Sequence, residues 1–160
     1  ARASVLTPHL GEFRALFPEL SAGVEHDPWG AAAKAAEMAG AVVLLKGVPS
    51  VVGVPGRDAW WTVAAGNPGL ATGGSGDVLS GLIGAFLAQG LPPATAAALG
   101  AQTLGRAAEI AARRVTVRAM RPMDVVAGLP DLWRAWDIRR TARPAPRAPV
   151  LVELDRPRVV

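Results

Sequence analysis

AVVLLKG, residues 41–47, is the most informative run in this chain. Its unbroken series of β-branched and aliphatic residues predicts a strand buried on both faces, which is typical of parallel sheets. The run ends in Lys46, a charge placed where the strand leaves the core. Open α/β sheets bind ligands at the carboxyl ends of their strands, so Lys46 is a candidate binding cation. The alternative is a lysine whose stem lies along the sheet edge and whose ammonium reaches water.

Both strands and helices are predicted before and after this strand in the sequence. Three more short strands are predicted, at 4–6 (SVL), 50–56 (SVVGVPG) and 59–64 (AWWTVA). Apolar residues at helical spacing predict helices at 7–20, 28–40, 78–91, 94–114 and 123–136. Thr7 has the side chain of an N-cap for the first helix, with Pro8 in its first turn. The order predicts a layered α/β domain with a mainly parallel sheet, and the start on a strand end predicts a domain that lacks its N-terminal strands.

Composition restricts the class of protein. The 160 residues suffice for one domain with a core, and 51% of them are hydrophobic, which argues against global disorder. The absence of cysteine excludes disulfides and thiolate metal sites, and two histidines do not suffice for a His-rich metal centre. No signal-peptide pattern opens the chain, and the apolar run at 78–91 is shorter than the roughly 20 residues of a membrane span. We therefore expect a soluble, cytoplasmic protein without a membrane partner.

The net charge of +4 comes from the C-terminal end alone. Residues 1–137 hold 11 Lys or Arg and 11 Asp or Glu, whereas residues 138–160 hold six arginines against Glu153 and Asp155. A basic segment can contact nucleic acid, but this one has four prolines and no aromatic residue for base stacking. We therefore predict a domain at 1–137, a solvated basic tail at 138–160, and no nucleic-acid partner.

A glycine-rich loop, GNPGLATGGSGD at residues 66–77, precedes the most apolar predicted helix. It is not a GxxxxGK[ST] phosphate loop, because no lysine follows, and it is not a dinucleotide fingerprint, because Leu79 stands where the third glycine belongs. What remains is a loop that leads into a helix N-terminus, whose free amides and positive dipole end suit an anion. Glycines remove the side chains that would hold a phosphate away.

Asp77, at the end of this loop, has two interpretations. As the residue before a helix it is an N-cap. As a carboxylate aimed into an anion pocket it accepts a proton from a hydroxyl while phosphate is transferred. A carboxylate facing phosphate is repulsive, so its presence beside such a loop favours the chemical role.

The segment TPHLGE at residues 7–12 places His9 and Glu12 on the same side of a first helical turn. Either Thr7 caps the helix while Glu12 pairs with the helix dipole, or His9, at the carboxyl end of a strand, contacts a polar ligand. Taken together, the three stretches place His9, Lys46 and Asp77 at the same end of one sheet.

The stretches TPHLGE, LLKGVPSVV and GNPGLATGGSGDVLSGLIGAFLAQG, in this order, resemble the ADP-dependent NAD(P)H-hydrate dehydratases. These repair enzymes are related to the ribokinase superfamily and are sometimes fused to an epimerase domain. The resemblance runs from about Val5 to Trp136 and implies a ribokinase-like αβα fold, of which this chain holds the C-terminal portion. It implies ADP-dependent dehydration of hydrated NADH and NADPH to NAD(P)H, AMP and phosphate. It also implies Mg²⁺ as cofactor, ADP as co-substrate, and a homo-oligomer.

The resemblance also implies roles for individual residues. His9 resembles the histidine that contacts the hydrated nucleotide, and Asp77 resembles the aspartate at the substrate hydroxyl, where it acts as base. Gly76 resembles a second nucleotide contact. The segment that binds the adenine nucleotide corresponds to Lys46, Gly47, Val48, Pro49 and Ser50. The amides that stabilise charge on the transferred phosphoryl group are those of Gly73, Gly74, Ser75 and Gly76.

Three residues differ from those that the family usually has. Leu10 stands where the family usually has proline, Ser50 where it has threonine, and Leu70 where it has methionine.

Two rival functions are possible. One is a ribokinase-like kinase for a vitamin precursor or a sugar, against which TPHLGE and LLKGVPS favour the dehydratase. The other rival is an inactive, truncated nucleotide-binding fragment, whose missing strands leave a sheet edge exposed.

Overall fold

A five-stranded sheet forms the centre of the molecule in the computed structural model, which describes residues 4–57, 59–142 and 152–155. The strands lie side by side in chain order from β1 to β5. Their bounds are β1 (Val5–Leu6), β2 (Val42–Leu45), β3 (Ser50–Gly53), β4 (Ala59–Val63) and β5 (Val152–Asp155).

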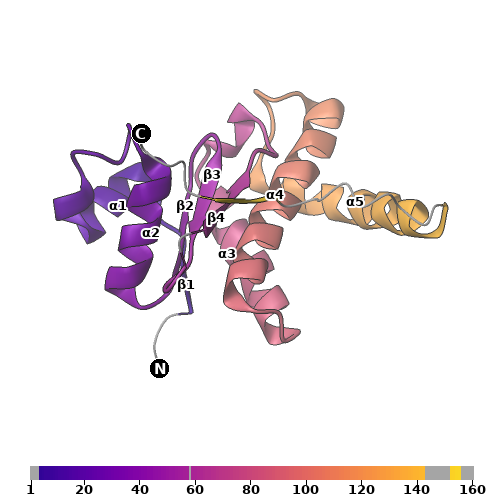
Figure 1. The fold of residues 1–160 in the computed structure, drawn as a ribbon. Helices are drawn as coiled ribbons and strands as arrows, with labels where there is room; N and C mark the ends of the chain where they lie inside the picture. The colour runs from indigo at the N-terminus through magenta and orange to yellow at the C-terminus, as the bar shows by residue number, and fades with distance from the viewer. Residues whose placement is uncertain (1–3, 58, 143–151, 156–160) are drawn as a thin grey trace.

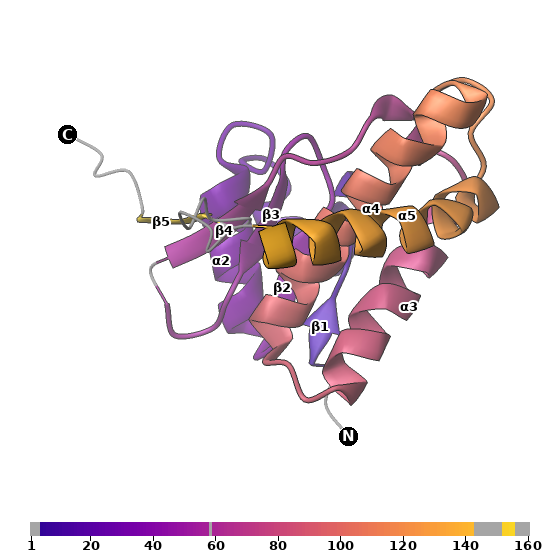
Figure 2. The ribbon, with the colours of Figure 1, turned by 90° about the vertical axis from the view of Figure 1, so that its right-hand side faces the viewer.

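Helices cover both faces of this sheet (Figure 1). The described α-helices are α1 (Leu10–Leu16), α2 (Pro28–Ala39), α3 (Ser75–Ala88), α4 (Pro93–Val115) and α5 (Pro122–Ala142). Two 3₁₀ turns, η1 (Pro18–Leu20) and η2 (Pro68–Leu70), follow α1 and β4 in the chain. On one face lie α1 and α2, and on the other lie α3 and α4, with α5 packed against α4 (Figure 2). The predicted layered α/β class is confirmed.

β2 shows why two helical layers form. All four of its residues are buried, and they divide between two cores because successive side chains of a strand point to opposite faces. Val43 and Leu45 pack with Phe13 and α2, whereas Val42 and Leu44 pack with α3 and α4. A strand that is apolar on both faces therefore holds the two layers together.

Strand direction differs from the predicted mainly parallel sheet. β1 and β2 are parallel, but β2 with β3, β3 with β4, and β4 with β5 are antiparallel. The link at 46–49 and the one that follows Gly53 are both too short for a parallel crossover, which needs about a dozen residues or more. Burial on both faces, which suggested parallel strands, arises here from helices on both sides of a mixed sheet.

The predicted boundary at residue 137 lies in a region that the structure describes in part. That boundary falls inside α5, which continues to Ala142, and Val152–Asp155 pairs with β4 as a strand. The division into a domain and a tail stays a prediction, and the remaining tail residues, 143–151 and 156–160, lie outside the described residues. Among the helices described, none has the length and apolar character needed to cross a membrane.

Gly53 at the end of β3 tests how tightly α2 packs on the sheet. A Cβ at Gly53 would lie 2.2 Å from the carbonyl oxygen of Ala32 in the α2 backbone. We expect Gly53→Ala to lower the free energy of unfolding by about 1–3 kcal/mol, because helix and strand must move apart. Urea denaturation at equilibrium measures this change.

Gly84→Ala is the matched control. Gly84 lies inside α3, is exposed, and has no atom within 4 Å of its Cβ position. Alanine there gains up to about 1 kcal/mol through helix propensity. Equal unfolding free energies for the two variants would contradict the close packing at Gly53.

Candidate functional site

The parallel pairing of β1 and β2 continues one step beyond the strands. His9 and Lys46 form an isolated parallel bridge, in which the Lys46 N–H donates to the Pro8 carbonyl at 2.8 Å. Since parallel strands end at the same edge of a sheet, this bridge places His9 and Lys46 side by side.

α1 begins at this bridge. Its N-cap is His9, whose Nδ1 accepts from the Glu12 N–H at 3.0 Å, while the His9 N–H donates to Glu12 Oε2 at 2.7 Å. This reciprocal pair is a capping box. The prediction that Thr7 is the N-cap is therefore wrong, because the chain stays extended through Pro8, whose carbonyl is bonded to Lys46.

Glu12 also reaches Lys46. The Lys46 Nζ lies 3.3 Å from Glu12 Oε2, and the His9 Nε2 lies 3.5 Å from Glu12 Oε1. Since His9 Nδ1 accepts a hydrogen bond, the ring has its donor position at Nε2, and the contact of Nε2 with Oε1 is too long for a hydrogen bond. The His9 N–H and then Lys46 hold the pKa of Glu12 below its ordinary value.

The glycine-rich loop ends at the N-terminus of α3. Gly74 is the N-cap of α3 with φ +91°, a left-handed conformation that favours glycine, and no side chain caps this helix. Asp77 is therefore not the N-cap, and this interpretation is wrong. It is an exposed residue of the first turn, whose N–H donates to the Gly74 carbonyl at 3.1 Å.

Ser75, the first residue of α3, is 6% exposed, and its Oγ has no hydrogen-bond partner within the described part of the chain. A buried hydroxyl without a partner is unfavourable and therefore fits a site that takes a polar ligand. Of the predicted anion-binding amides, that of Ser75 makes a long bond of 3.3 Å to the Thr72 carbonyl. Gly73 is exposed and has open space at its Cβ position.

The β2 edge and the start of α3 meet at Gly76. A Cβ at Gly76 would lie 3.5 Å from Lys46 Nζ, so the ammonium lies directly beside the first turn of α3. The structure thus brings together His9, Lys46 and the turn that carries Asp77. One cation, one exposed carboxylate and a helix N-terminus without a side-chain cap can hold an anion and accept a proton beside it.

The segment after Lys46 forms a compact turn. The Ser50 hydroxyl accepts from the Gly47 N–H at 3.3 Å and donates to the Gly47 carbonyl at 3.2 Å. The Val48 side chain is fully exposed, and the bond between Val48 and Pro49 is cis. The five predicted residues therefore run through this turn, from Lys46 in the bridge to Ser50 at the start of β3.

Two further residues, to which the sequence patterns did not point, hold the start of the glycine-rich loop. Glu109 of α4 accepts from the Gly66 N–H at 3.2 Å, and the Asn67 Oδ1 accepts from the Gly69 N–H at 2.9 Å. Asn67 before a proline is a recognisable cap signal. Glu109 gives no local signal, because its contact spans 43 positions.

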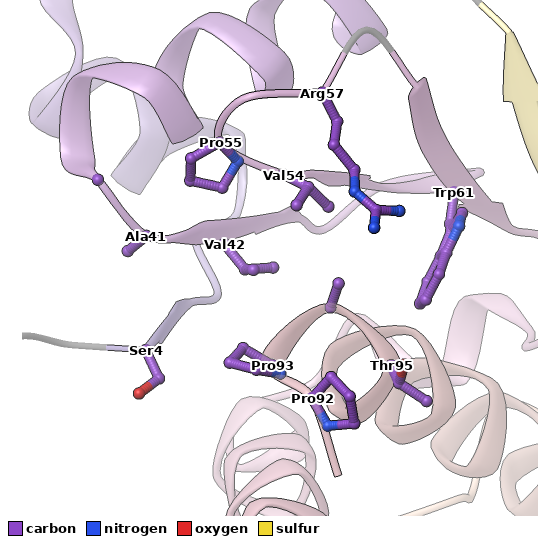
Figure 3. Close-up of a pocket in the computed structure, with 12 residues that line it drawn as sticks. Ser4, Ala41, Val42, Val54, Pro55, Arg57, Trp61, Pro92, Pro93 and Thr95 are labelled. Atoms are coloured by element: carbon purple, nitrogen blue, oxygen red, sulfur yellow. The ribbon is translucent and has the colours of Figure 1, made fainter.

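A cavity of about 580 Å³ lies at the other end of β2, away from these residues (Figure 3). Val42 at the start of β2 lines it, together with Trp61 of β4 and Pro93 at the start of α4. The Arg57 side chain points toward it from the link between β3 and β4. None of the predicted site residues lines this cavity.

Within the described ranges no group of three or more His, Cys, Asp or Glu side chains is arranged to hold a metal.

A family model described as NAD(P)H-hydrate dehydratase matches residues 1–131. A bifunctional NAD(P)H-hydrate repair enzyme of Moorella thermoacetica is 45% identical over 130 residues, which are 81% of this chain and 24% of that relative. An ADP-dependent (S)-NAD(P)H-hydrate dehydratase of Neisseria meningitidis is 43% identical over 106 residues, which are 66% of this chain and 36% of that relative.

Solved structures of a dehydratase and of a kinase are similar to this chain. An ADP/ATP-dependent NAD(P)H-hydrate dehydratase from Bacillus subtilis, co-crystallised with ATP and Mg²⁺, has a TM-score of 0.73 at 30% identity over 82% of this chain and 47% of that structure. A hydroxyethylthiazole kinase of Pyrococcus horikoshii has a TM-score of 0.70 at 27% identity, over 96% and 56%. The chain therefore spans about half of these structures and about a quarter of the bifunctional relative.

The low pKa of Glu12 predicts a pH dependence of stability. The folded-state pKa lies below the ordinary value of 4.5, so the ionised carboxylate stabilises the fold above that pH. This contribution is lost as the pH falls through the folded-state pKa. Because Glu12 is half exposed, we expect it to be below about 1 kcal/mol.

The measurement is the difference in free energy of unfolding between the unmodified chain and Glu12→Gln. It should shrink between about pH 6 and about pH 3, where Glu12 becomes protonated. Glu25→Gln, which removes the ion pair of Glu25 with Arg14 of α1, is the control for pairing away from the site. A difference for Glu12→Gln that stays constant over this range would refute the prediction.

Proposed function

Because the chain belongs to the NAD(P)H-hydrate dehydratase family, we propose that it is part of an enzyme that dehydrates hydrated NADH and NADPH with ADP, giving NAD(P)H, AMP and phosphate. One observation carries the proposal. The Lys46 ammonium lies 3.5 Å from the Cβ position of Gly76, at the uncapped start of α3, in the same helical turn as the exposed residue Asp77. A nucleotide phosphate and a hydroxyl that loses its proton are ligands of matching chemistry.

The first step is phosphoryl transfer. The added hydroxyl of the nicotinamide ring attacks the β-phosphorus of ADP, Asp77 takes the hydroxyl proton, and the bond to the departing AMP oxygen breaks. Lys46 and the amides at Gly73–Gly76 stabilise the charge on the transferred group, and the buried Ser75 hydroxyl is available as a further donor. In this proposal His9 contacts the hydrated nucleotide, and the Gly47–Ser50 loop contacts the adenine nucleotide.

The second step is elimination. Hydroxide is a poor leaving group and phosphate is a good one, so the transfer makes the ring substituent able to depart. The lone pair of the ring nitrogen expels phosphate, and loss of a proton from the neighbouring ring carbon restores the double bond. The products are free phosphate and the reduced nicotinamide.

Magnesium belongs to the proposal as a cofactor bound together with the nucleotide. It usually keeps several of its waters and is held largely by substrate phosphate oxygens, so it would arrive with the nucleotide, and no protein ligand is assigned to it. Magnesium, when bound, neutralises charge on the phosphates. A cytoplasmic location and assembly into a homo-oligomer, both predicted from the sequence, stay predictions.

A kinase for a small molecule is the second candidate function. The likeness to the hydroxyethylthiazole kinase over 96% of this chain supports it, since that enzyme shares the layered fold. The two functions differ in their products. A kinase leaves a stable phosphorylated substrate, whereas a dehydratase releases phosphate and regenerates the reduced nicotinamide.

The testing experiment incubates hydrated NADH with ADP and Mg²⁺ and follows the absorbance of NADH together with free phosphate. This chain is compared with a version extended at its N-terminus by further residues of the family domain. We expect equal amounts of NADH and phosphate from the extended version. A phosphorylated product without phosphate release would favour the kinase, and no consumption of ADP by either version would overturn the proposal.

Asp77→Asn tests the role of the base. Without the carboxylate the hydroxyl proton has no acceptor at this position, so we expect turnover to fall by at least about 100-fold. The dissociation constant for ADP, measured by calorimetry, should stay close to that of the unmodified protein.

Asp27→Asn is the control for the loss of one aspartate charge. Asp27 caps α2 through the Gly30 N–H, on the other face of the sheet, and asparagine is an equally good cap. Turnover of Asp77→Asn equal to that of Asp27→Asn would remove Asp77 from the mechanism.

A further inference from the structure

Glu12 connects the two halves of the site that the proposed function uses. Its carboxylate contacts Lys46, on the nucleotide side, and His9, on the side of the hydrated substrate. The proposed function gives Glu12 no role. The contacts described above nevertheless give it a position between the two binding residues.

On the side of His9, the backbone of Glu12 orients the imidazole ring. The Glu12 N–H donates to Nδ1 at 3.0 Å, which leaves Nε2 as the donor position of the ring. The Glu12 Oε1 lies 3.5 Å from Nε2, which is too far for a hydrogen bond. The ring is therefore held at Nδ1, and its donor at Nε2 is available to a ligand.

On the side of Lys46, the carboxylate restrains a flexible chain. A lysine ammonium is a point charge on four rotatable carbons, so its position depends on the partners it finds. The Lys46 side chain is 26% exposed, and the Glu12 Oε2 at 3.3 Å is its ion-pair partner in the described residues. In this position the ammonium lies beside Gly76 at the start of α3.

We propose that Glu12 is a positioning residue, which holds the Lys46 ammonium at the anion-binding end of α3 and orients His9 at the same time. This inference rests on the proposed function. The Glu12 Oε2 accepts from the His9 backbone and also pairs with Lys46, so the start of α1 and the cation of the site share one carboxylate oxygen. Because the Lys46 side chain is already ordered, less conformational entropy is lost when a phosphate binds.

Glu12→Gln removes the negative charge of this side chain but keeps its hydrogen bond in the cap of α1. The glutamine carbonyl still accepts from the His9 N–H, but the amide does not pair with an ammonium. We expect the dissociation constant for ADP to rise about fivefold, because the nucleotide must then order the Lys46 side chain itself. Glu25→Gln, which removes the ion pair on α1 with Arg14, should leave ADP binding unchanged. Where turnover is measured, KM for ADP should rise with little change in kcat.

A second measurement reports on Lys46 without requiring activity. The chain has two lysines, Lys34 and Lys46, so lysine labelled with ¹³C gives two side-chain signals, and the exposed Lys34 serves as internal reference. In Glu12→Gln the ε-methylene signal of Lys46 should move and narrow as the side chain gains freedom. The signal of Lys34 should stay in place, and Glu25→Gln should move neither.

The outcomes separate this inference from the proposed function. Weaker ADP binding and a moved Lys46 signal, in a protein that never dehydrates hydrated NADH, would support Glu12 and overturn the function. Turnover with unchanged ADP affinity and an unmoved Lys46 signal in Glu12→Gln would overturn the role of Glu12 alone. If the unmodified chain binds no ADP, the Lys46 signal decides by itself.

Discussion

The parallel pairing of β1 with β2 is the constraint on which the site depends. It continues past the strands through the Lys46 N–H and the Pro8 carbonyl, and this hydrogen bond keeps the chain extended up to His9. α1 therefore begins at the sheet edge, with its capping box formed over the end of β2. A change in the pairing by one residue would send the Lys46 side chain to the other face of the sheet.

At this edge of the sheet the same side chains stabilise the fold and form the candidate site. The Glu12 carboxylate completes a helix cap and also pairs with the cation that lies beside α3. At α3 the arrangement is the reverse, because the helix begins at Gly74 without a side-chain cap and with the Ser75 hydroxyl unpaired in the described chain. One helix start is satisfied internally, whereas the other remains available to an anion.

Much of the fold was predictable from local signals. The apolar run of β2 predicted a buried strand, Pro28 and Gly40 predicted the ends of α2, and the apolar spacing after the glycine-rich loop predicted α3. Strand direction was not predictable from burial, because helices on both faces bury a mixed sheet as well as a parallel one. The cap of α1 was misplaced because the bond that holds Pro8 extended comes from Lys46, far along the chain.

The sequence by itself determined which chemical groups the site contains. A lysine at a strand end, a histidine after another strand and a glycine-rich loop that runs into Asp77 can be read from the residues alone. Only the tertiary structure decided which of these groups meet. Lys46 pairs with Glu12 and lies beside Gly76, and the α3 cap falls to Gly74 instead of Asp77. Distances between side chains depend on strand pairing and on where each helix begins, and hydrogen bonds between residues distant in the chain set both.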